Sequence, residues 1–101
     1  MKALQYLEKV SSSSWKRRNF VRAMRELDKW AREHVRGEHK FKVCHNFWLI
    51  LSEKGAFLER DEPDRHEFYA CSELSEDSPA VRGYLMYELK ARLPGILEEV
   101  V

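Results

Sequence analysis

Six basic residues recur at intervals of three and four along one segment, and their chemistry is that of anion binding. At 100° per residue, a helix places them within about 40° of a single line. Arginine suits this role because its planar guanidinium donates to two phosphate or carboxylate oxygens at once. We call these residues the basic ridge: Arg18, Arg22, Arg25, Lys29, Arg32 and Arg36. On a helix about 30 Å long, the ridge predicts binding to a polyanion, either nucleic acid or an acidic protein groove.

An alternative interpretation of the basic ridge is a solvated helix face that its own acids neutralise. Residues three or four positions apart form ion pairs within a helix. The spacing allows the pairs Arg22–Glu26, Asp28–Arg32, Lys29–Glu33 and Glu33–Arg36. The predicted helix holds eight basic residues and three acids, so at least five basic side chains stay without an acid. The sequence leaves both interpretations open.

Metal binding and catalysis find less support in the sequence. Tetrahedral zinc needs four converging ligands, and the chain lacks the paired spacing of a zinc knuckle. Nothing marks a nucleophile elbow, a phosphate-binding glycine loop or a paired-carboxylate site. The residues considered as metal ligands are His34, His39, Cys44, His45, His66 and Cys71. We therefore expect a protein that is not an enzyme, with no catalytic residue, no metal and no cofactor.

Charge is distributed unevenly along the chain. The net charge is +1, but residues 1–46 hold twelve Lys/Arg against five Asp/Glu, a balance of +7. Residues 47–101 hold six Lys/Arg against twelve Asp/Glu, a balance of −6. The acids between Glu59 and Asp77 are interpreted as a solvated turn and the N-terminal residues of a helix. Such separated charge makes the protein a dipole rather than a uniform polycation.

Length and composition predict a single domain over residues 1–101. The chain has 101 residues and 44% apolar side chains, enough for a packed core of modest size. The longest apolar run, Phe47–Leu51, has five residues, so we expect no membrane span. The two cysteines cannot form a disulfide framework, and a reducing, cytoplasmic setting is therefore the default prediction.

The first third of the chain predicts two helices. Met1–Val10 is a short helix whose apolar contacts are Leu4 and Leu7. Trp15–Arg36 gives the strongest helical pattern, and Gly37 supplies its C-terminal cap. The apolar face of this second helix consists of Phe20, Ala23, Met24, Leu27 and Ala31. Because the basic ridge lies opposite that face, we expect the ridge to face solvent.

The segment 40–52 allows two interpretations. As a strand, it places Phe41, Val43, His45, Phe47, Leu49 and Leu51 on one face, and five of these six are apolar. As a helix over 42–54 capped by Gly55, it leaves Cys44, Trp48 and Leu49 scattered. The count, together with the aromatic and β-branched residues, favours the strand.

Two further strands follow this segment. Glu53–Gly55 fits a three-residue hairpin loop with glycine at the left-handed position. Ala56–Arg60 is the next predicted strand, and Asp61–Asp64 is a turn because Pro63 is excluded from a central ladder. His66–Cys71 is the last predicted strand. The three strands are expected to form an antiparallel meander.

The final element is a helix that begins with Ser78 as N-cap and Pro79 in the first turn. Pro94 and Gly95 are expected to break it. Its buried stripe consists of Val81, Leu85, Met86, Leu89 and Leu93. The predicted fold class is therefore α+β, in the order α-α-β-β-β-α.

An apolar patch on the meander is the second predicted interaction surface. Trp48 and Ile50 share a strand face with Lys40 and Lys42, and Tyr69 is expected to join them. A helix, for example Met1–Val10, is the alternative cover for this face. If the face is exposed, burial between two copies predicts a weak homodimer, which the opposite charges of the two halves would orient antiparallel.

The sequence thus predicts a small non-catalytic binding protein of the regulator or inhibitor type. It would hold a polyanion through the basic ridge. The alternative is a protein–protein interaction module that docks or dimerises through Trp48, Ile50 and Tyr69.

Overall fold

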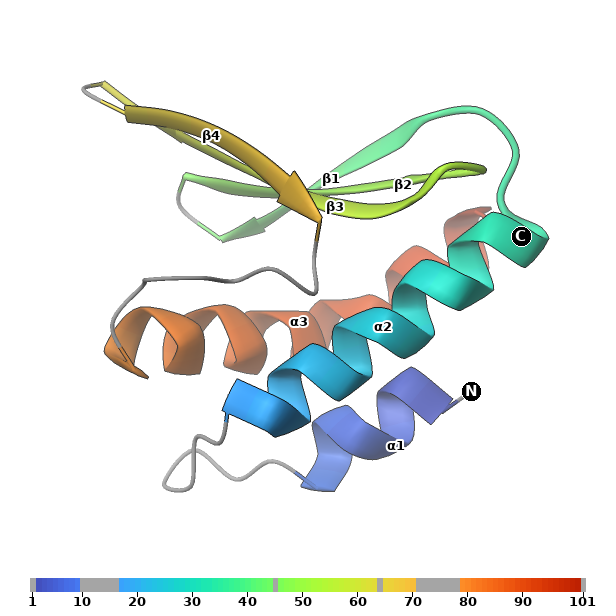
Figure 1. Cartoon of the computed structure of the whole chain (residues 1–101), viewed down its shortest axis with the longest axis horizontal. Helices are drawn as coiled ribbons and strands as arrows, with labels where there is room; N and C mark the ends of the chain where they lie inside the picture. The colour runs from blue at the N-terminus through green and yellow to red at the C-terminus, as the bar shows by residue number, and fades with distance from the viewer. Residues whose placement is uncertain (1, 10–16, 45, 64, 71–78, 101) are drawn as a thin grey trace.

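The computed structural model describes residues 2–9, 17–44, 46–63, 65–70 and 79–100, and it forms one sheet with three helices on one side (Figure 1). The elements in chain order are α1 (Lys2–Lys9), α2 (Arg17–His34), β1 (His39–Cys44), β2 (Phe47–Ser52), β3 (Gly55–Glu62), β4 (Arg65–Ala70) and α3 (Pro79–Val100). The strands lie in chain order and every neighbouring pair is antiparallel. The predicted α+β class, with a meander between N-terminal helices and a C-terminal helix, is confirmed.

The segment predicted as one strand over 40–52 forms two strands. The extended conformation is confirmed, and the alternative helix over 42–54 is wrong. The chain reverses between β1 and β2, where Asn46 adopts a φ of 70°, a left-handed conformation that asparagine tolerates. The pairing register also shifts between Lys42 and Cys44. The meander therefore has four strands instead of three.

Gly55 closes a tight hairpin between β2 and β3. Its φ of 129° lies in the region that favours glycine, as the sequence predicted. Gly55 already pairs with Ser52, so the loop consists of Glu53 and Lys54 and is one residue shorter than expected. The Ser52 hydroxyl accepts a hydrogen bond from the backbone N–H of Lys54 at 3.1 Å. Glycine and hydroxyl together fix this turn.

The core lies between the sheet and the helices. Helix α2 packs against β2 and β3, α3 packs against β1, and α1 packs against the other two helices. Fully buried side chains come from every layer: Ala3, Ala23, Met24, Leu27, Ala31, Leu49, Leu51, Leu58, Leu85, Leu89 and Leu93. The predicted apolar face of α2 is thus confirmed over Ala23–Ala31. Its opposite face is left for solvent.

Pro94 does not end the last helix, which continues to Val100. The prediction of a break was wrong because packing outweighs the local cost of proline. Leu93, Ile96 and Leu97 are at most 9% exposed, whereas Pro94 is exposed. The hydrogen bond that proline removes lies on the solvent side, and the buried leucine and isoleucine side chains hold the following turn on the core.

Several predicted boundaries move by one or two residues. Helix α2 ends at His34, two residues before the predicted Arg36, so Gly37 has a positive φ of 74° but does not directly follow the helix. Strand β3 continues through Glu62, so the predicted turn at 61–64 is shorter. Ser78, the predicted N-cap of α3, lies outside the described residues. None of the helices in the described ranges is long and apolar enough to span a membrane.

Candidate functional site

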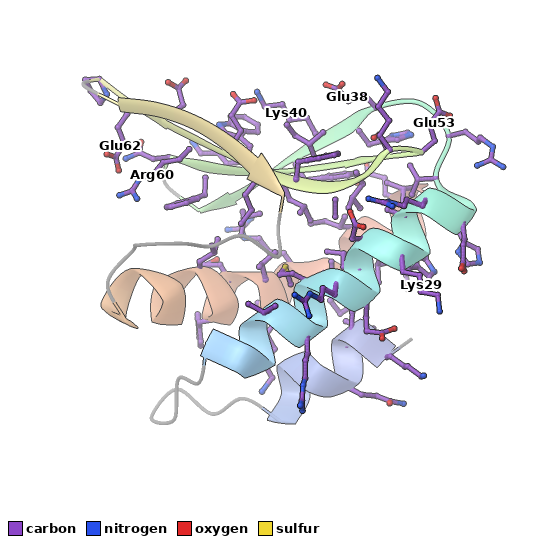
Figure 2. The ribbon with its side chains drawn as sticks, viewed as in Figure 1. Lys29, Glu38, Lys40, Glu53, Arg60 and Glu62 are labelled. Atoms are coloured by element: carbon purple, nitrogen blue, oxygen red, sulfur yellow. The ribbon has the colours of Figure 1, made fainter. Side chains whose placement is uncertain are left out.

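Helix α2 presents the basic ridge to solvent. Arg22, Arg25, Lys29 and Arg32 are exposed, and so is Arg36, which lies just beyond the end of the helix. Figure 2 shows Lys29 pointing away from the sheet. The orientation expected from the helical period is therefore confirmed at these positions. Arg18 lies in the first turns of α2, but its side chain is outside the described part of the structure.

Most of the ion pairs that could neutralise the basic ridge are not formed. Arg32 pairs with Asp28, with 3.1 Å between Nε and Oδ2. Within the described residues, Arg22, Arg25, Lys29 and Arg36 form no ion pair. Of the four pairs that the spacing allows, the structure forms Asp28–Arg32 alone among those residues. The interpretation of the ridge as a self-neutralised face therefore loses most of its support.

Asp28 attaches the ridge helix to the sheet. Its Oδ1 accepts a hydrogen bond from the backbone N–H of Ala56 at 2.9 Å, while Oδ2 holds Arg32. A Cβ atom at Gly55 would collide with the Asp28 carboxylate, so the contact needs glycine at that position. The basic ridge is thus carried on a helix that is anchored by a buried apolar face and by a side-chain bond to the β2–β3 turn.

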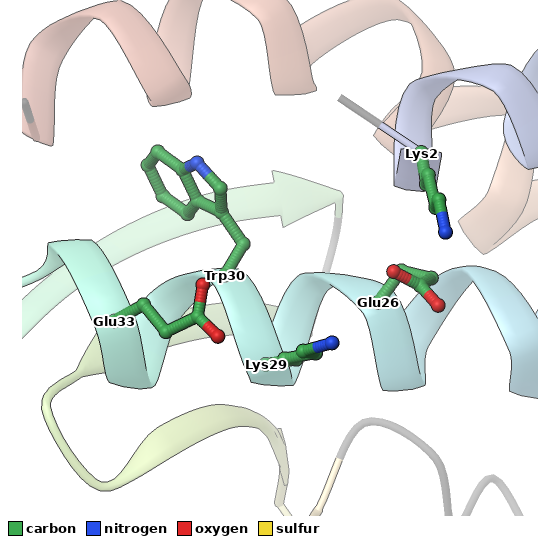
Figure 3. A pocket seen from close by; sticks show the side chains of 5 residues that line it. All are labelled: Lys2, Glu26, Lys29, Trp30 and Glu33. Carbon is green, nitrogen blue, oxygen red and sulfur yellow. The ribbon is translucent and has the colours of Figure 1, made fainter.

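A shallow pocket of about 190 Å³ adjoins the ridge between α1 and α2 (Figure 3). Its walls are Lys2 from α1 and Glu26, Lys29, Trp30 and Glu33 from α2. The four α2 residues are spaced i, i+3, i+4 and i+7, which places them on one side of the helix. We call this site the Trp30 pocket. Lys29 belongs both to it and to the basic ridge.

The indole that lines this pocket is held in place from two sides. Trp30 is half-buried and packs against the core. Its ring stacks with that of His34, with 5.2 Å between centroids and 19° between planes. The Nδ1–H of His34 donates to the Trp30 carbonyl at 3.0 Å. The indole therefore contacts both the core and the His34 ring.

The sheet face opposite the helices carries Trp48 and Ile50, but it is not the exposed apolar patch that the sequence predicted. Ile50 is 5% exposed although it lies outside the main core cluster. Trp48 is half-buried, with the Nζ atoms of Lys40 and Lys42 at 4.8 and 5.8 Å from its ring centroid. The predicted alternative cover, α1, packs on the helices instead. The lysine side chains of β1 thus lie over the Trp48 ring.

Tyr69 does not share the sheet face of Trp48. The register pairs Tyr69 with Leu58, which is fully buried beneath the helices, and pairs Phe68 with Glu59. Glu59 pairs on its other side with Trp48. Cross-strand partners lie on the same face of a sheet, so the grouping of Tyr69 with Trp48 and Ile50 was wrong. The period-two pattern of β4 alone could not show which of its two faces met the core.

Two acids of the stretch interpreted as solvated take part in ion pairs of the sheet. Glu59 accepts from Nζ of Lys40 at 3.0 Å. Glu62 accepts from Nε of Arg60 at 3.1 Å, and Figure 2 shows both residues at the end of β3. Arg60 is 8% exposed, and its guanidinium lies 5.2 Å from the centroid of the Phe47 ring. These acids therefore stabilise cations of the sheet.

Within the described residues, the side chains considered as metal ligands do not form a cluster. In the described ranges, no three His, Cys, Asp or Glu residues are placed to hold a metal ion. His34 donates to Trp30, and Nε2–H of His39 donates to the Arg36 carbonyl at 2.9 Å. The histidine rings of α2 and β1 thus serve local backbone contacts. His45 and Cys71 lie outside the described residues.

The sequence interpretation missed the Trp30 pocket. The apolar face predicted for α2 did not include Trp30, and no prediction connected Trp30 with Glu26, Lys29 and Glu33. The i, i+3, i+4, i+7 spacing could have grouped the α2 residues. Nothing in the spacing could show that Lys2 closes the site, because that contact depends on how α1 packs against α2.

Comparison with known proteins assigns no family to the chain. No protein-family model matches it, and neither the curated proteins nor the solved structures give a match. The chain is an α+β protein in which a four-stranded meander supports a helix with exposed cations. That geometry is the basis for a functional proposal.

Proposed function

We propose that this chain is a small, non-catalytic binding protein, of the regulator or inhibitor type, that holds a polyanionic partner through the basic ridge. The observation that supports this proposal is the state of the ridge cations. Arg22, Arg25, Lys29 and Arg36 are exposed and, within the described residues, form no ion pair. Arg22, Arg25 and Lys29 can attract a polyanion without first breaking an ion pair. Arg36 also donates from its guanidinium to the Val35 carbonyl at 3.2 Å, a neutral contact that leaves its charge unpaired.

The dimensions of the ridge suit the phosphate backbone of a nucleic acid. Ridge residues three or four positions apart are separated by about 4.5–6 Å along the helix axis, and Arg22 and Arg32 by about 15 Å. Arginine grips a phosphate in two places, and each neutralised phosphate releases a condensed counterion. Phosphate groups are therefore the ligand we favour, and an acidic protein groove is the other polyanion to be tested.

Charge reversal with a matched control tests the proposal. We expect Arg22→Glu with Arg25→Glu to weaken the binding of labelled single-stranded and duplex oligonucleotides much more than the control substitutions do. The control is Lys42→Glu with Lys90→Glu, which changes the net charge equally at exposed positions on the opposite face of the sheet and on α3. Circular dichroism should show native helix content for both proteins. Equal loss of affinity in both would mean that net charge, not the ridge, drives association.

Polyglutamate serves as the probe for an acidic protein surface. If it binds at the ridge while oligonucleotides do not, the partner is an acidic protein. If neither polyanion binds at physiological salt, the proposed function is wrong.

The alternative proposal is a weak homodimer formed through the sheet face that bears Trp48. Figure 1 shows this face on the side opposite the helices, which supports the alternative, whereas the 5% exposure of Ile50 reduces the apolar area available. Sedimentation equilibrium tests it. A dimer that Trp48→Ala converts to a folded monomer would favour the homodimer, and a monomer at high concentration would exclude it.

A further inference from the structure

The Trp30 pocket lies beside the basic ridge and shares Lys29 with it. If the phosphates of a nucleic-acid strand lie on the ridge, the bases or sugars of that strand can therefore reach this pocket. The pocket is open and shallow, and its volume of about 190 Å³ is below the roughly 300–1,000 Å³ of a typical small-molecule site. It suits one ring system and not a whole nucleotide.

The lining of the pocket is neutral overall but rich in polar groups. Lys2 and Lys29 contribute two ammonium groups, and Glu26 and Glu33 contribute two carboxylates. In Figure 3 the Lys2 side chain of α1 points toward Glu26 of α2. A phosphate would favour a cationic pocket and a lysine or arginine side chain an anionic one. A neutral, flat group with both donors and acceptors is the ligand that matches this lining.

We propose that the Trp30 pocket holds one unpaired base of a single-stranded nucleic acid whose phosphates lie on the basic ridge. This inference rests on the proposed function. The ring of His34 stacks on one face of the Trp30 indole, and the part of the indole that lines the pocket is the surface left for a base. Stacking on an aromatic side chain suits every base, because each has a π-face.

The two carboxylates give the pocket a preference among the bases. Glu26 and Glu33 can only accept hydrogen bonds when ionised, so they favour a base edge that donates. Guanine presents two adjacent donors, N1–H and the N2 amino group, to a single carboxylate, whereas thymine presents one. Lys2 and Lys29 can donate to the carbonyl oxygen of the same base. We therefore expect guanine to bind more tightly than thymine.

Three short oligonucleotides of equal length and charge test this inference by fluorescence anisotropy. They are an oligothymidine, the same strand with one central guanine, and a strand in which every site is abasic. We expect the oligothymidine to bind about five- to 140-fold more tightly than the abasic strand, the range expected for one stacked base. The strand with guanine should bind more tightly again.

The indole N–H signals in an NMR titration locate the binding site. The Trp30 signal should shift with both base-containing strands and stay in place with the abasic strand. The Trp48 signal, from the opposite face of the sheet, is the internal control. A preference for bases without a change at Trp30 would overturn the location that we propose.

Two variants separate the pocket from the ridge. Trp30→Phe keeps an aromatic ring in the core and should retain part of the preference for bases, whereas Trp30→Ala should lose it. Because Trp30→Ala also removes core packing, Glu33→Gln provides a second readout at an exposed position. It should reduce the ratio of guanine to thymine affinity while the abasic strand still binds.

The outcomes distinguish the two proposals. If all three strands bind equally, the pocket takes no base and this inference is wrong, while the basic ridge remains a phosphate-binding surface. If no strand binds, the nucleic-acid form of the proposed function fails, and the inference about the pocket fails with it.

Discussion

Replacing Asp28 with alanine tests how the ridge helix is attached to the sheet. The substitution removes the acceptor for the Ala56 N–H at 2.9 Å and the ion pair to Arg32 at 3.1 Å. A hydrogen bond to a charged group contributes about 1.5–3 kcal/mol, and an ion pair with an exposed partner contributes about 0.2–1 kcal/mol. Alanine's better helix propensity offsets up to about 0.7 kcal/mol. We expect a net loss of about 1–3 kcal/mol in the free energy of unfolding.

The matched control for this substitution is Glu88→Ala in α3. Glu88 forms the same kind of i, i+4 pair, with 3.0 Å to Nε of Arg92, and no bond from it to the sheet is found within the described residues. Its replacement should cost less than about 1 kcal/mol. Asp28→Asn keeps an oxygen acceptor and should fall between the two. Urea denaturation measures the free energy of unfolding of all three variants. Equal losses for Asp28→Ala and Glu88→Ala would show that the hydrogen bond between Asp28 and Ala56 does not stabilise the fold.

Four further substitutions test three features of the fold by denaturation. Gly55→Ala should destabilise by more than about 1 kcal/mol because the new Cβ meets the Asp28 carboxylate at a positive φ, whereas Gly95→Ala, with nothing within 4 Å, should stabilise by about 0.5–1 kcal/mol. If both substitutions changed the free energy of unfolding in the same direction, the collision with Asp28 would not be what determines the effect at Gly55. Pro94→Ala should stabilise the protein by about 1–3 kcal/mol, since α3 already passes through this position. Destabilisation would mean that the proline favours the helix geometry that the core requires. Trp48→Ala should cost about 1–2 kcal/mol through lost cation–π contact and partial burial, and a loss above about 4 kcal/mol would place Trp48 in the main core.

Periodicity predicted the parts of the fold in which one face meets the core and the other meets solvent. In α2 the 3.6-residue period separates Ala23, Leu27 and Ala31 from the basic ridge, and the structure buries and exposes them accordingly. Glycine was equally informative, because a positive φ at Gly37 and Gly55 is a backbone requirement that few other residues meet.

The errors came from positions where tertiary contacts override local signals. The reversal at Asn46 contains neither glycine nor proline, so a period-two pattern passes through it unmarked. At Pro94 the burial of Ile96 and Leu97 outweighs the local cost. On the open sheet face, Lys40 and Lys42 cover Trp48 with their long side chains, an arrangement that a count of apolar residues does not reveal.

The candidate site was predictable as a surface and not as a set of interactions. Spacing alone placed the ridge cations on one line. Asp28 pairs with Arg32, as the spacing allowed, and it also accepts from the Ala56 N–H, which the spacing could not show. The Trp30 pocket depends on a contact between helices, since Lys2 and Glu26 are distant in sequence.

The salt dependence of oligonucleotide binding tests the role of the basic ridge most directly. Four ridge cations without ion pairs, Arg22, Arg25, Lys29 and Arg36, predict a slope of about −3 for log K against log salt concentration on a single strand. Reversal of Arg22 and Arg25 should roughly halve that slope, and the control reversal of Lys42 and Lys90 should leave it unchanged. A slope near zero, or equal slopes for the two reversed proteins, would contradict polyanion binding by the ridge.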